Sequence, residues 1–240
     1  MIDPHYLDPR LVELYDLTCG WSADRDFYLS LAASRKRILD LGCGTGLLCD
    51  AYAARNHDVT GVDPAAGMLE AARRKPRGGD VAWVQASAQA YRSEKRFDLI
   101  IMTGHAFQVL LSDDDVLAAF TTMRMHLCPD GIAAFESRNP AIDWKSMWDY
   151  DVEVESRGTP VRMANRFLAM HDDRLSFELR YEFPDETLVS PSVLRFLSRR
   201  EIEERLVASG LRIESVLGSW DAGPFDEASS DEMIFIARAA

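Results

Sequence analysis

The sequence predicts an α/β fold in which helices sandwich a mostly parallel sheet, with an antiparallel β insertion after the fifth strand. From Lys36 to about Ser137, strands and helices alternate in units of roughly thirty residues, as strand–helix–strand units require. The run Phe97–Met102 is apolar on both faces, which a central parallel strand needs because helices cover it above and below. After Asn139 this alternation stops, and strands with one apolar face are expected up to about Leu197.

The first part of the chain predicts helices around five strands. Helices interrupted near Thr18–Trp21 are expected in the segment Leu7–Ser34, before the first strand. A helix follows that strand over Leu47–Arg55, and Pro64 suits the first turn of the helix after the second strand. Ser112 is the expected N-cap of a further helix, and the three acids after it favour the positive end of the helix dipole. The strands are expected at Arg37–Leu41, Asp58–Val62, Val81–Gln85, Phe97–Met102 and, after a turn at Pro129–Gly131, Ile132–Glu136.

The insertion, about Ala141–Leu197, is expected to contain strands and no helix. Apolar and polar residues alternate in Leu175–Phe183, which is typical of a strand with one buried face. The segments His171–Arg174 and Pro184–Glu186 are expected to be the turns at its two ends. Neighbouring strands are expected at Met163–Met170, at Thr187–Leu197 and around Val152 and Val154.

The last part of the chain is expected to complete the parallel core. Ser198 and Glu201 form a capping-box pattern for a helix that runs through Ser209. Two further strands are expected at Leu211–Leu217 and Glu232–Arg238. The expected organisation is an α/β core with N-terminal helices over residues 1–140, the β insertion over 141–197, and completion of the core over 198–240.

Composition and charge restrict the class of protein. The 240 residues fit one domain with an insertion, and 27 basic against 39 acidic residues give a net charge of −12. Such a surface repels phosphate backbones and anionic lipids, so we expect neither nucleic acid nor a membrane as partner. The cysteines and histidines lack the spacing of a metal site, and no metal is expected. The start of the chain lacks the pattern of a signal peptide, so we expect a cytoplasmic protein, monomeric or homodimeric, that acts on a small molecule.

A glycine-rich turn lies between the first strand and the helix that follows it. Gly42, Gly44 and Gly46 suit a turn whose backbone passes close to a ligand. The helix N-terminus offers N–H groups for an anionic part of that ligand. Asp63 ends the next strand, where a carboxylate can accept hydrogen bonds from both ribose hydroxyls. The pair predicts a nucleoside ligand at the carboxyl ends of the parallel strands.

Three other classes of protein have to be weighed. An NAD(P)-dependent oxidoreductase needs a third glycine at the position of Leu47. The phosphate-binding loop of a nucleoside triphosphatase needs Lys followed by Ser or Thr. Neither requirement is met. A non-catalytic cofactor-binding or interaction module is the remaining alternative, and the intact glycines and Asp63 disfavour it.

Two motifs resemble those of the class I S-adenosylmethionine-dependent methyltransferases. Ile38–Gly46 is similar to the first motif of that family and Gly61–Leu69 to the second, and the resemblance spans Arg37–Arg138. It implies a Rossmann-like seven-stranded sheet whose last strand is antiparallel, with S-adenosyl-L-methionine as cofactor. The implied activity is transfer of a methyl group to N or O of a small-molecule metabolite.

The resemblance also assigns contacts to the cofactor. Met68 is expected on the face of the adenine, while Ser87 stands where the family commonly has an acid that contacts the adenine amino group. Thr103, Gly104 and Phe107 follow the fourth strand and are expected beside the methionine half. The complete expected set is Gly42, Cys43, Gly44, Thr45, Gly46, Asp63, Pro64, Met68, Ser87, Ala88, Thr103, Gly104 and Phe107.

Catalysis and substrate binding have fewer candidates. His105 follows the central fourth strand, so its neutral imidazole is a candidate general base; the alternative is that it only lines the pocket. Arg138 is a candidate partner for a substrate carboxylate. The insertion is expected to be a substrate lid or a dimer surface. The aromatic candidates for the substrate pocket and its cover are Trp144, Trp148, Trp220, Tyr15, Trp21 and Tyr28.

Overall fold

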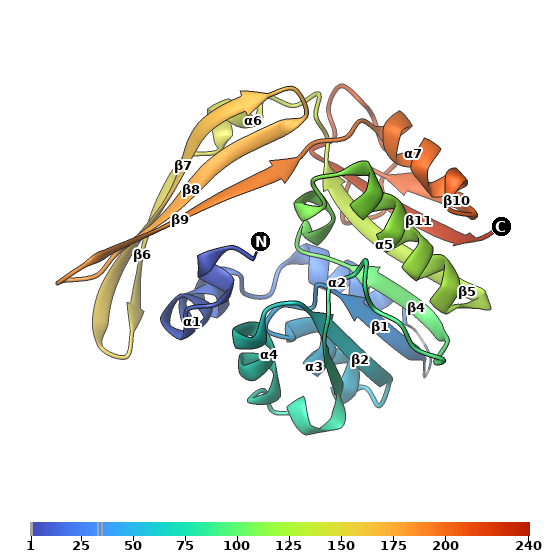
Figure 1. Cartoon of the computed structure of the whole chain (residues 1–240), viewed down its shortest axis with the longest axis horizontal. Coiled ribbons are helices and arrows are strands. Elements are labelled where there is room, and N and C mark those ends of the chain that lie inside the picture. The colour runs from blue at the N-terminus through green and yellow to red at the C-terminus, as the bar shows by residue number, and fades with distance from the viewer. Residues whose placement is uncertain (1, 33, 35) are drawn as a thin grey trace.

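Two β-sheets form the framework of the molecule (Figure 1). The computed structural model describes residues 2–32, 34 and 36–240. The larger sheet consists of β1 (Arg37–Leu41), β2 (Asp58–Asp63), β3 (Ala82–Gln85), β4 (Phe97–Met102), β5 (Leu127–Arg138), β10 (Leu211–Leu217) and β11 (Glu232–Ala239). The smaller sheet consists of β6 (Tyr150–Ser156), β7 (Thr159–His171), β8 (Arg174–Glu182) and β9 (Thr187–Arg195).

Helices cover both faces of the larger sheet. On one face, Phe120 and Ile202 belong to a buried cluster with Phe135 of the sheet, and on the other Tyr28 and Tyr52 pack around Ile101. The longer helices are α1 (Pro9–Thr18), α2 (Ala23–Ser30), α3 (Leu47–Ala54), α4 (Ala66–Arg73), α5 (Asp113–His126) and α7 (Arg199–Ala208). The short ones are η1 (Pro4–Tyr6), η2 (Gly78–Asp80), η3 (Ala106–Val109) and α6 (Trp144–Met147).

The strand order places the loops of the site. The larger sheet has the order β10-β11-β5-β4-β1-β2-β3, in which β11 is antiparallel to both of its neighbours. The strands β1 to β5 pair in parallel, so the predicted seven-stranded, mostly parallel sheet is confirmed. The chain continues from β1 to β2 on one side, whereas β4 lies on the other side of β1. Ligands of such sheets bind at the carboxyl ends of the strands where the order reverses.

Three local predictions are wrong. The strand β5 begins at Leu127 and includes residues 129–131, where a turn was expected. The pairing of β5 with β4 is irregular at this point. Pro64 lies before the helix and not in its first turn, since α4 begins at Ala66. The Asp63 carboxylate stabilises the turn between β2 and α4 by accepting the Ala65 N–H at 2.8 Å. The insertion contains α6, which at four residues is too short to show helical periodicity in the sequence.

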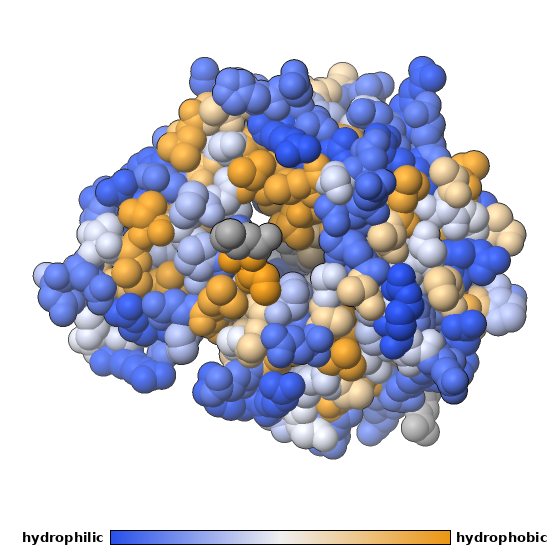
Figure 2. Space-filling model, in the orientation of Figure 1, coloured by the Kyte–Doolittle hydropathy of each residue, from blue (hydrophilic) through white to orange (hydrophobic). Residues whose placement is uncertain are grey.

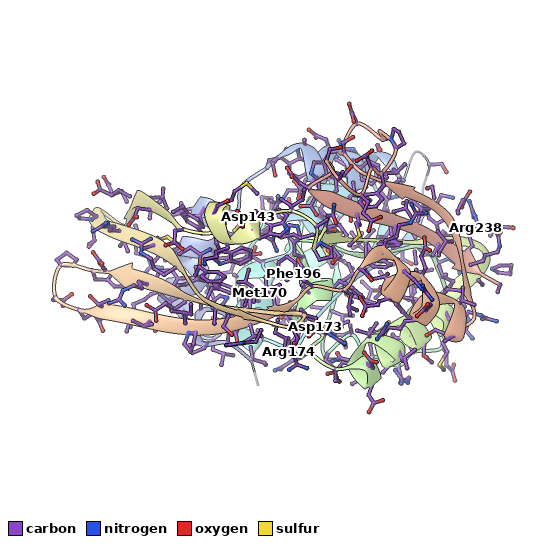
Figure 3. All side chains as sticks on the ribbon, turned by 90° about the horizontal axis from the view of Figure 1, so that it is seen from above. Asp143, Met170, Asp173, Arg174, Phe196 and Arg238 are labelled. Carbon is purple, nitrogen blue, oxygen red and sulfur yellow. The ribbon has the colours of Figure 1, made fainter. Side chains whose placement is uncertain are left out.

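The smaller sheet reaches out from the core and is held both at the turn between β7 and β8 and by α1. Figure 3 shows Asp173 and Arg174 beside the core, at the turn between β7 and β8. Arg174 donates to the Leu111 carbonyl at 2.7 Å, and Arg195 pairs with Asp113 at 2.8 Å. The inner face of the sheet packs Met163 against α1, which in turn contacts α4. Among the described residues, no helix has both the length and the apolar composition to cross a membrane.

Candidate active site

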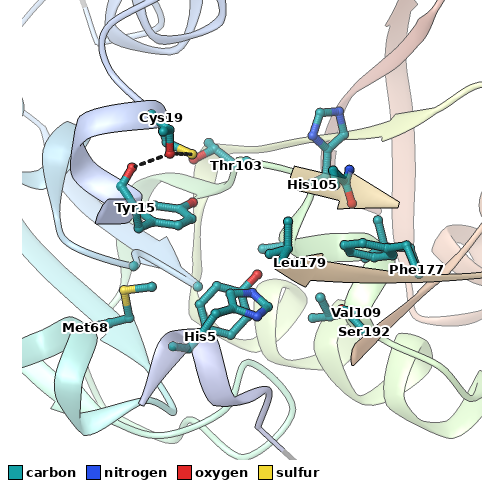
Figure 4. A pocket seen from close by; sticks show the side chains of 18 of the residues that line it. His5, Tyr15, Cys19, Met68, Thr103, His105, Val109, Phe177, Leu179 and Ser192 are labelled. Atoms are coloured by element: carbon teal, nitrogen blue, oxygen red, sulfur yellow. Dashed lines mark hydrogen bonds between the residues drawn. The ribbon is translucent and has the colours of Figure 1, made fainter. Parts of the chain in front are cut away.

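A cavity of about 690 Å³ lies between the carboxyl ends of the parallel strands, the N-terminal helices and the inner face of the smaller sheet. Hydrophobic side chains border a hollow on the face shown in Figure 2. In the close view, Met68, Thr103 and His105 come from the core, His5 and Tyr15 from the N-terminal segment, and Phe177, Leu179 and Ser192 from the smaller sheet (Figure 4).

The glycine turn has a left-handed backbone at each of its three glycines. Gly42, Gly44 and Gly46 have φ of 78°, 54° and 74°. A Cβ at Gly44 would meet no atom within 4 Å, so this glycine faces open space. A Cβ at Gly46 would lie 2.5 Å from the ring of Trp83, and Gly46 does not line the cavity. Gly44 therefore leaves room for a ligand, whereas Gly46 permits close packing inside the protein.

Asp63 is the acid beside this turn. Its side chain is buried, and its two oxygens accept the N–H of Gly44 at 2.9 Å and the N–H of Ala65 at 2.8 Å. Burial raises the pKa of Asp63, while the two backbone hydrogen bonds oppose that rise. Because each carboxylate oxygen has a second lone pair, Asp63 can accept further hydrogen bonds from the cavity that it lines.

A second acid, Asp40, lies at the end of β1 and was not singled out from the sequence. Burial raises its pKa to about 7, and Cys49 Sγ contacts its Oδ2 at 3.4 Å. Its Oδ1 has no hydrogen-bond partner among the described residues. Asp40 lines a small hollow that adjoins the glycine turn, together with Cys43 and Thr45. In the sequence, the signal that points to Asp40 is its position next to the glycine turn.

His105 is held by two glutamates from neighbouring strands. Its backbone is left-handed, with φ of 59°, and its N–H donates to Glu136 Oε1 at 2.7 Å. Its ring Nε2 lies 2.8 Å from Glu232 Oε1. Burial raises the pKa of Glu136, which also accepts a hydrogen bond from the hydroxyl of Tyr28. Neither glutamate was predicted, because β5 and β11 meet only in the folded sheet.

Arg138 lies in an aromatic wall of the cavity. Its guanidinium carbon is 5.4 Å from the ring centre of Trp144 and 5.2 Å from that of Trp148, and Nη1 donates to Gln108 Oε1 at 2.9 Å. Arg138 and the two tryptophans line the cavity, whereas Gln108 does not. Desolvation lowers the pKa of Arg138, and stacking on aromatic faces stabilises its charge.

The N-terminal segment closes another side of the cavity. Tyr15 and Trp21 line it as predicted cover residues, and Asp16 of α1 accepts a hydrogen bond from the hydroxyl of Thr45. His5, which the sequence did not indicate, is buried with Nδ1 at 2.8 Å from the hydroxyl of Ser190 on β9. Burial lowers the pKa of His5 to about 4, so the ring is neutral at pH 7.

Thirteen of the predicted site residues line the main cavity. They are Gly42, Gly44, Asp63, Pro64, Met68, Thr103, Gly104, His105, Arg138, Trp144, Trp148, Tyr15 and Trp21. Cys43 and Thr45 line the adjoining hollow. The remaining ones, which line neither, are Gly46, Ser87, Ala88, Phe107, Tyr28 and Trp220.

Core packing explains the placement of the three aromatic residues in that last group. The rings of Phe107 and Phe120 stack in the core with centres 5.5 Å apart. Tyr28 is fully buried, and its ring centre is 5.9 Å from that of Trp220. Ser87 lies in a turn, where its carbonyl accepts the N–H of Tyr91 at 3.0 Å. Large aromatic side chains bury readily, whether or not they follow a ligand-binding motif.

Known proteins resemble the chain over different lengths. Residues 38–131 match a family model described as a methyltransferase domain. A cypemycin N-terminal methyltransferase from Streptomyces sp is 23% identical over 99% of this chain and 100% of its own length. A ubiquinone biosynthesis O-methyltransferase from Bradyrhizobium sp. is 29% identical over 59% of this chain, which covers only 54% of that protein. Among solved structures, the sugar N-methyltransferase KedS8 from Streptoalloteichus sp matches with a TM-score of 0.79 and 19% identity, over 93% of this chain and 91% of that one.

Proposed function

Because this chain belongs to the class I S-adenosylmethionine-dependent methyltransferases, we propose that it methylates an amino nitrogen of a small molecule. The chain is a methyltransferase, and S-adenosylmethionine is its cofactor. The acceptor atom and the residue roles given below are proposals.

The extent of the similarities supports an amine as the acceptor. The relative named as an N-terminal methyltransferase covers 99% of the chain, and the sugar N-methyltransferase covers 93%. The O-methyltransferase covers 59%. The inner face of the insertion, formed by β6 to β9, is one wall of the cavity and is called the roof here. Proteins that match the chain over the insertion are therefore comparable on the side proposed for the acceptor. This difference in coverage is the observation that carries the proposal.

The residues beside the glycine turn fit the cofactor. Gly44 leaves open space beside Asp63, whose carboxylate oxygens can accept the ribose hydroxyls. Met68 lines the same cavity as an apolar surface for the adenine. Asp40 Oδ1, which accepts no hydrogen bond from the described chain, suits the amino group of the methionine half. When bound, the cofactor supplies a sulfonium methyl group that is already electrophilic.

The contribution of the chain is to position a neutral amine and to exclude water. Met163, Phe177 and Leu179 give the roof an apolar inner surface, which keeps water from the reacting atoms. Holding the acceptor in line can lower the barrier by roughly 7–11 kcal/mol in favourable cases. Arg138 is placed to bind an anionic group of the acceptor, such as a carboxylate.

Methyl transfer to a panel of matched acceptors tests the proposed atom. With labelled S-adenosylmethionine, we expect products heavier by one or more methyl groups from L-alanine, L-alaninamide or L-alaninol. The matched alcohols L-lactate, L-lactamide and 1,2-propanediol, in which a hydroxyl replaces the amine, are expected to remain unchanged. Transfer to the alcohols but not to the amines, detected by mass spectrometry, contradicts N-methylation.

His105→Asn is expected to lower kcat by about a hundredfold, because a general base typically contributes about 10²–10⁴-fold to the rate. The Kd of the cofactor is expected to remain unchanged. Asparagine is the suitable replacement because His105 has a left-handed backbone, which asparagine tolerates. Steady-state kinetics and calorimetric titration of the cofactor provide the two values. Equal losses in kcat and in cofactor affinity would leave His105 as a residue that only lines the pocket.

A further inference from the structure

We propose that the roof of the cavity recognises a second group of the acceptor: a neutral hydroxyl or amide that both donates and accepts a hydrogen bond. The recognising side chains are Asn165 on β7 and Trp148 at the end of α6, and both line the cavity. The inference rests on the proposed function, because it assigns this part of the cavity to the methyl acceptor.

Asn165 is a buried residue whose side-chain oxygen has no hydrogen-bond partner in the described part of the chain. It is 8% exposed and pairs in register with Tyr150 and Leu179, two other cavity-lining residues. Its Oδ1 accepts no hydrogen bond from the residues that the structure describes. Asn139 is the contrasting case, because its Nδ2 donates to the carbonyls of Glu227 and Ser230 and its Oδ1 accepts from the Ala141 N–H.

Trp148 is also buried, and the polar group in question is a hydrogen-bond donor, whereas that of Asn165 is an acceptor. It is 6% exposed, and within the described part of the chain its Nε1 has no acceptor. Its ring packs against Phe177, with ring centres 5.2 Å apart. The Nε1 of Trp144 donates to the Asn139 carbonyl at 2.7 Å, and that of Trp83 to the Gly78 carbonyl at 2.8 Å.

The chemistry of these two groups defines what they bind. A buried polar group that lacks a partner costs stability, so such groups are rare unless a ligand satisfies them. Asn165 Oδ1 requires a donor, and Trp148 Nε1 requires an acceptor. Asn165 pairs with Leu179, which is two residues from Phe177 on β8, and Trp148 packs against Phe177, so a single hydroxyl or amide between them can provide both. Neither side chain carries a charge, so the pair selects a neutral group, whereas Arg138, stacked on the Trp148 ring, is left for a separate anionic group of the acceptor.

Binding of three amines to the protein saturated with S-adenosylhomocysteine tests the proposal. L-Alaninamide carries an amide, L-alaninol a hydroxyl, and 2-aminobutane replaces that hydroxyl with a methyl group. In calorimetry, we expect the amide or the alcohol to bind at least about tenfold more tightly than 2-aminobutane, and their order distinguishes an amide from a hydroxyl. Equal binding of all three, or no binding of any, overturns the proposal.

Two variants separate recognition from a structural role. Asn165→Leu and Trp148→Phe are expected to reduce the preference over 2-aminobutane to about twofold or less. Asn165→Leu is also expected to keep or raise the melting temperature, because it removes a buried acceptor that has no partner in the described chain. The control Leu168→Ala, at an exposed position of the same strand, should leave the preference unchanged.

Retained preference in both variants, or a lower melting temperature of Asn165→Leu with unchanged preference, overturns the inference. The binding assay needs no turnover. If the preference and its loss are observed but no amine is methylated, the proposed acceptor atom is wrong and the recognition by the roof stands.

Discussion

Asp63→Ala is expected to weaken binding of S-adenosylmethionine by about a hundredfold, because two hydrogen bonds to a charged acceptor, together worth about 3 kcal/mol, are lost. The loss has a second source in the protein itself. The Asp63 carboxylate accepts the N–H groups of Gly44 and Ala65, so its removal also loosens the turn that faces the ligand. Isothermal titration calorimetry with the cofactor measures the effect.

The same strand offers a matched control. Asp58 begins β2, at the end opposite to Asp63, and pairs with Lys95 at 2.8 Å outside the cavity. Asp58→Ala is expected to leave the dissociation constant of the cofactor unchanged. If Asp63→Ala binds the cofactor as tightly as the wild type does, the assignment of the ribose to this carboxylate is wrong.

Gly46→Ala is expected to lower the free energy of unfolding by about 3 kcal/mol. Left-handed backbone costs a non-glycine residue roughly 1–2 kcal/mol, and overpacking in a dense interior adds about 1–3 kcal/mol. The new Cβ would lie 2.5 Å from Trp83 and 2.9 Å from Ala72. For a chain of this size the melting temperature should fall by about 6–12 °C, which thermal unfolding followed by circular dichroism can measure.

Gly44→Ala is the informative comparison, since Gly44 also has a left-handed backbone but no neighbour in the way. We expect it to cost only the backbone strain of about 1–2 kcal/mol while weakening cofactor binding. The opposite pattern, a stable Gly46→Ala and a strongly destabilised Gly44→Ala, would contradict the division of the turn into a packed and a ligand-facing glycine.

The part of the cavity where we propose that the cofactor binds could be located from the sequence, because its signals are local. The glycine turn connects one strand to the next helix, and Asp63 ends the neighbouring parallel strand. Sheet topology then brings these two segments together, since parallel neighbours have their carboxyl ends at one edge. The structure places Gly42, Gly44 and Asp63 on one cavity.

The side of the cavity proposed for the acceptor could not be predicted to the same extent, because it depends on contacts between distant segments. His5 contacts Ser190 across 185 residues of sequence, and His105 contacts Glu232 across 127. Asn165 looks like an ordinary polar residue in an alternating strand, and only the fold reveals that it is buried and that its Oδ1 has no partner among the residues described. A local pattern shows which side of a strand is apolar but not what that side faces.

A crystal structure with bound S-adenosylhomocysteine tests the central claim most directly. We expect the ribose hydroxyls within hydrogen-bonding distance of Asp63, the adenosyl group against the turn that contains Gly44, and the sulfur directed toward the roof of the cavity. A structure in which the ligand leaves this cavity empty, or in which another acid binds the ribose, would contradict both the assignment of the cofactor site and the residue roles derived from it.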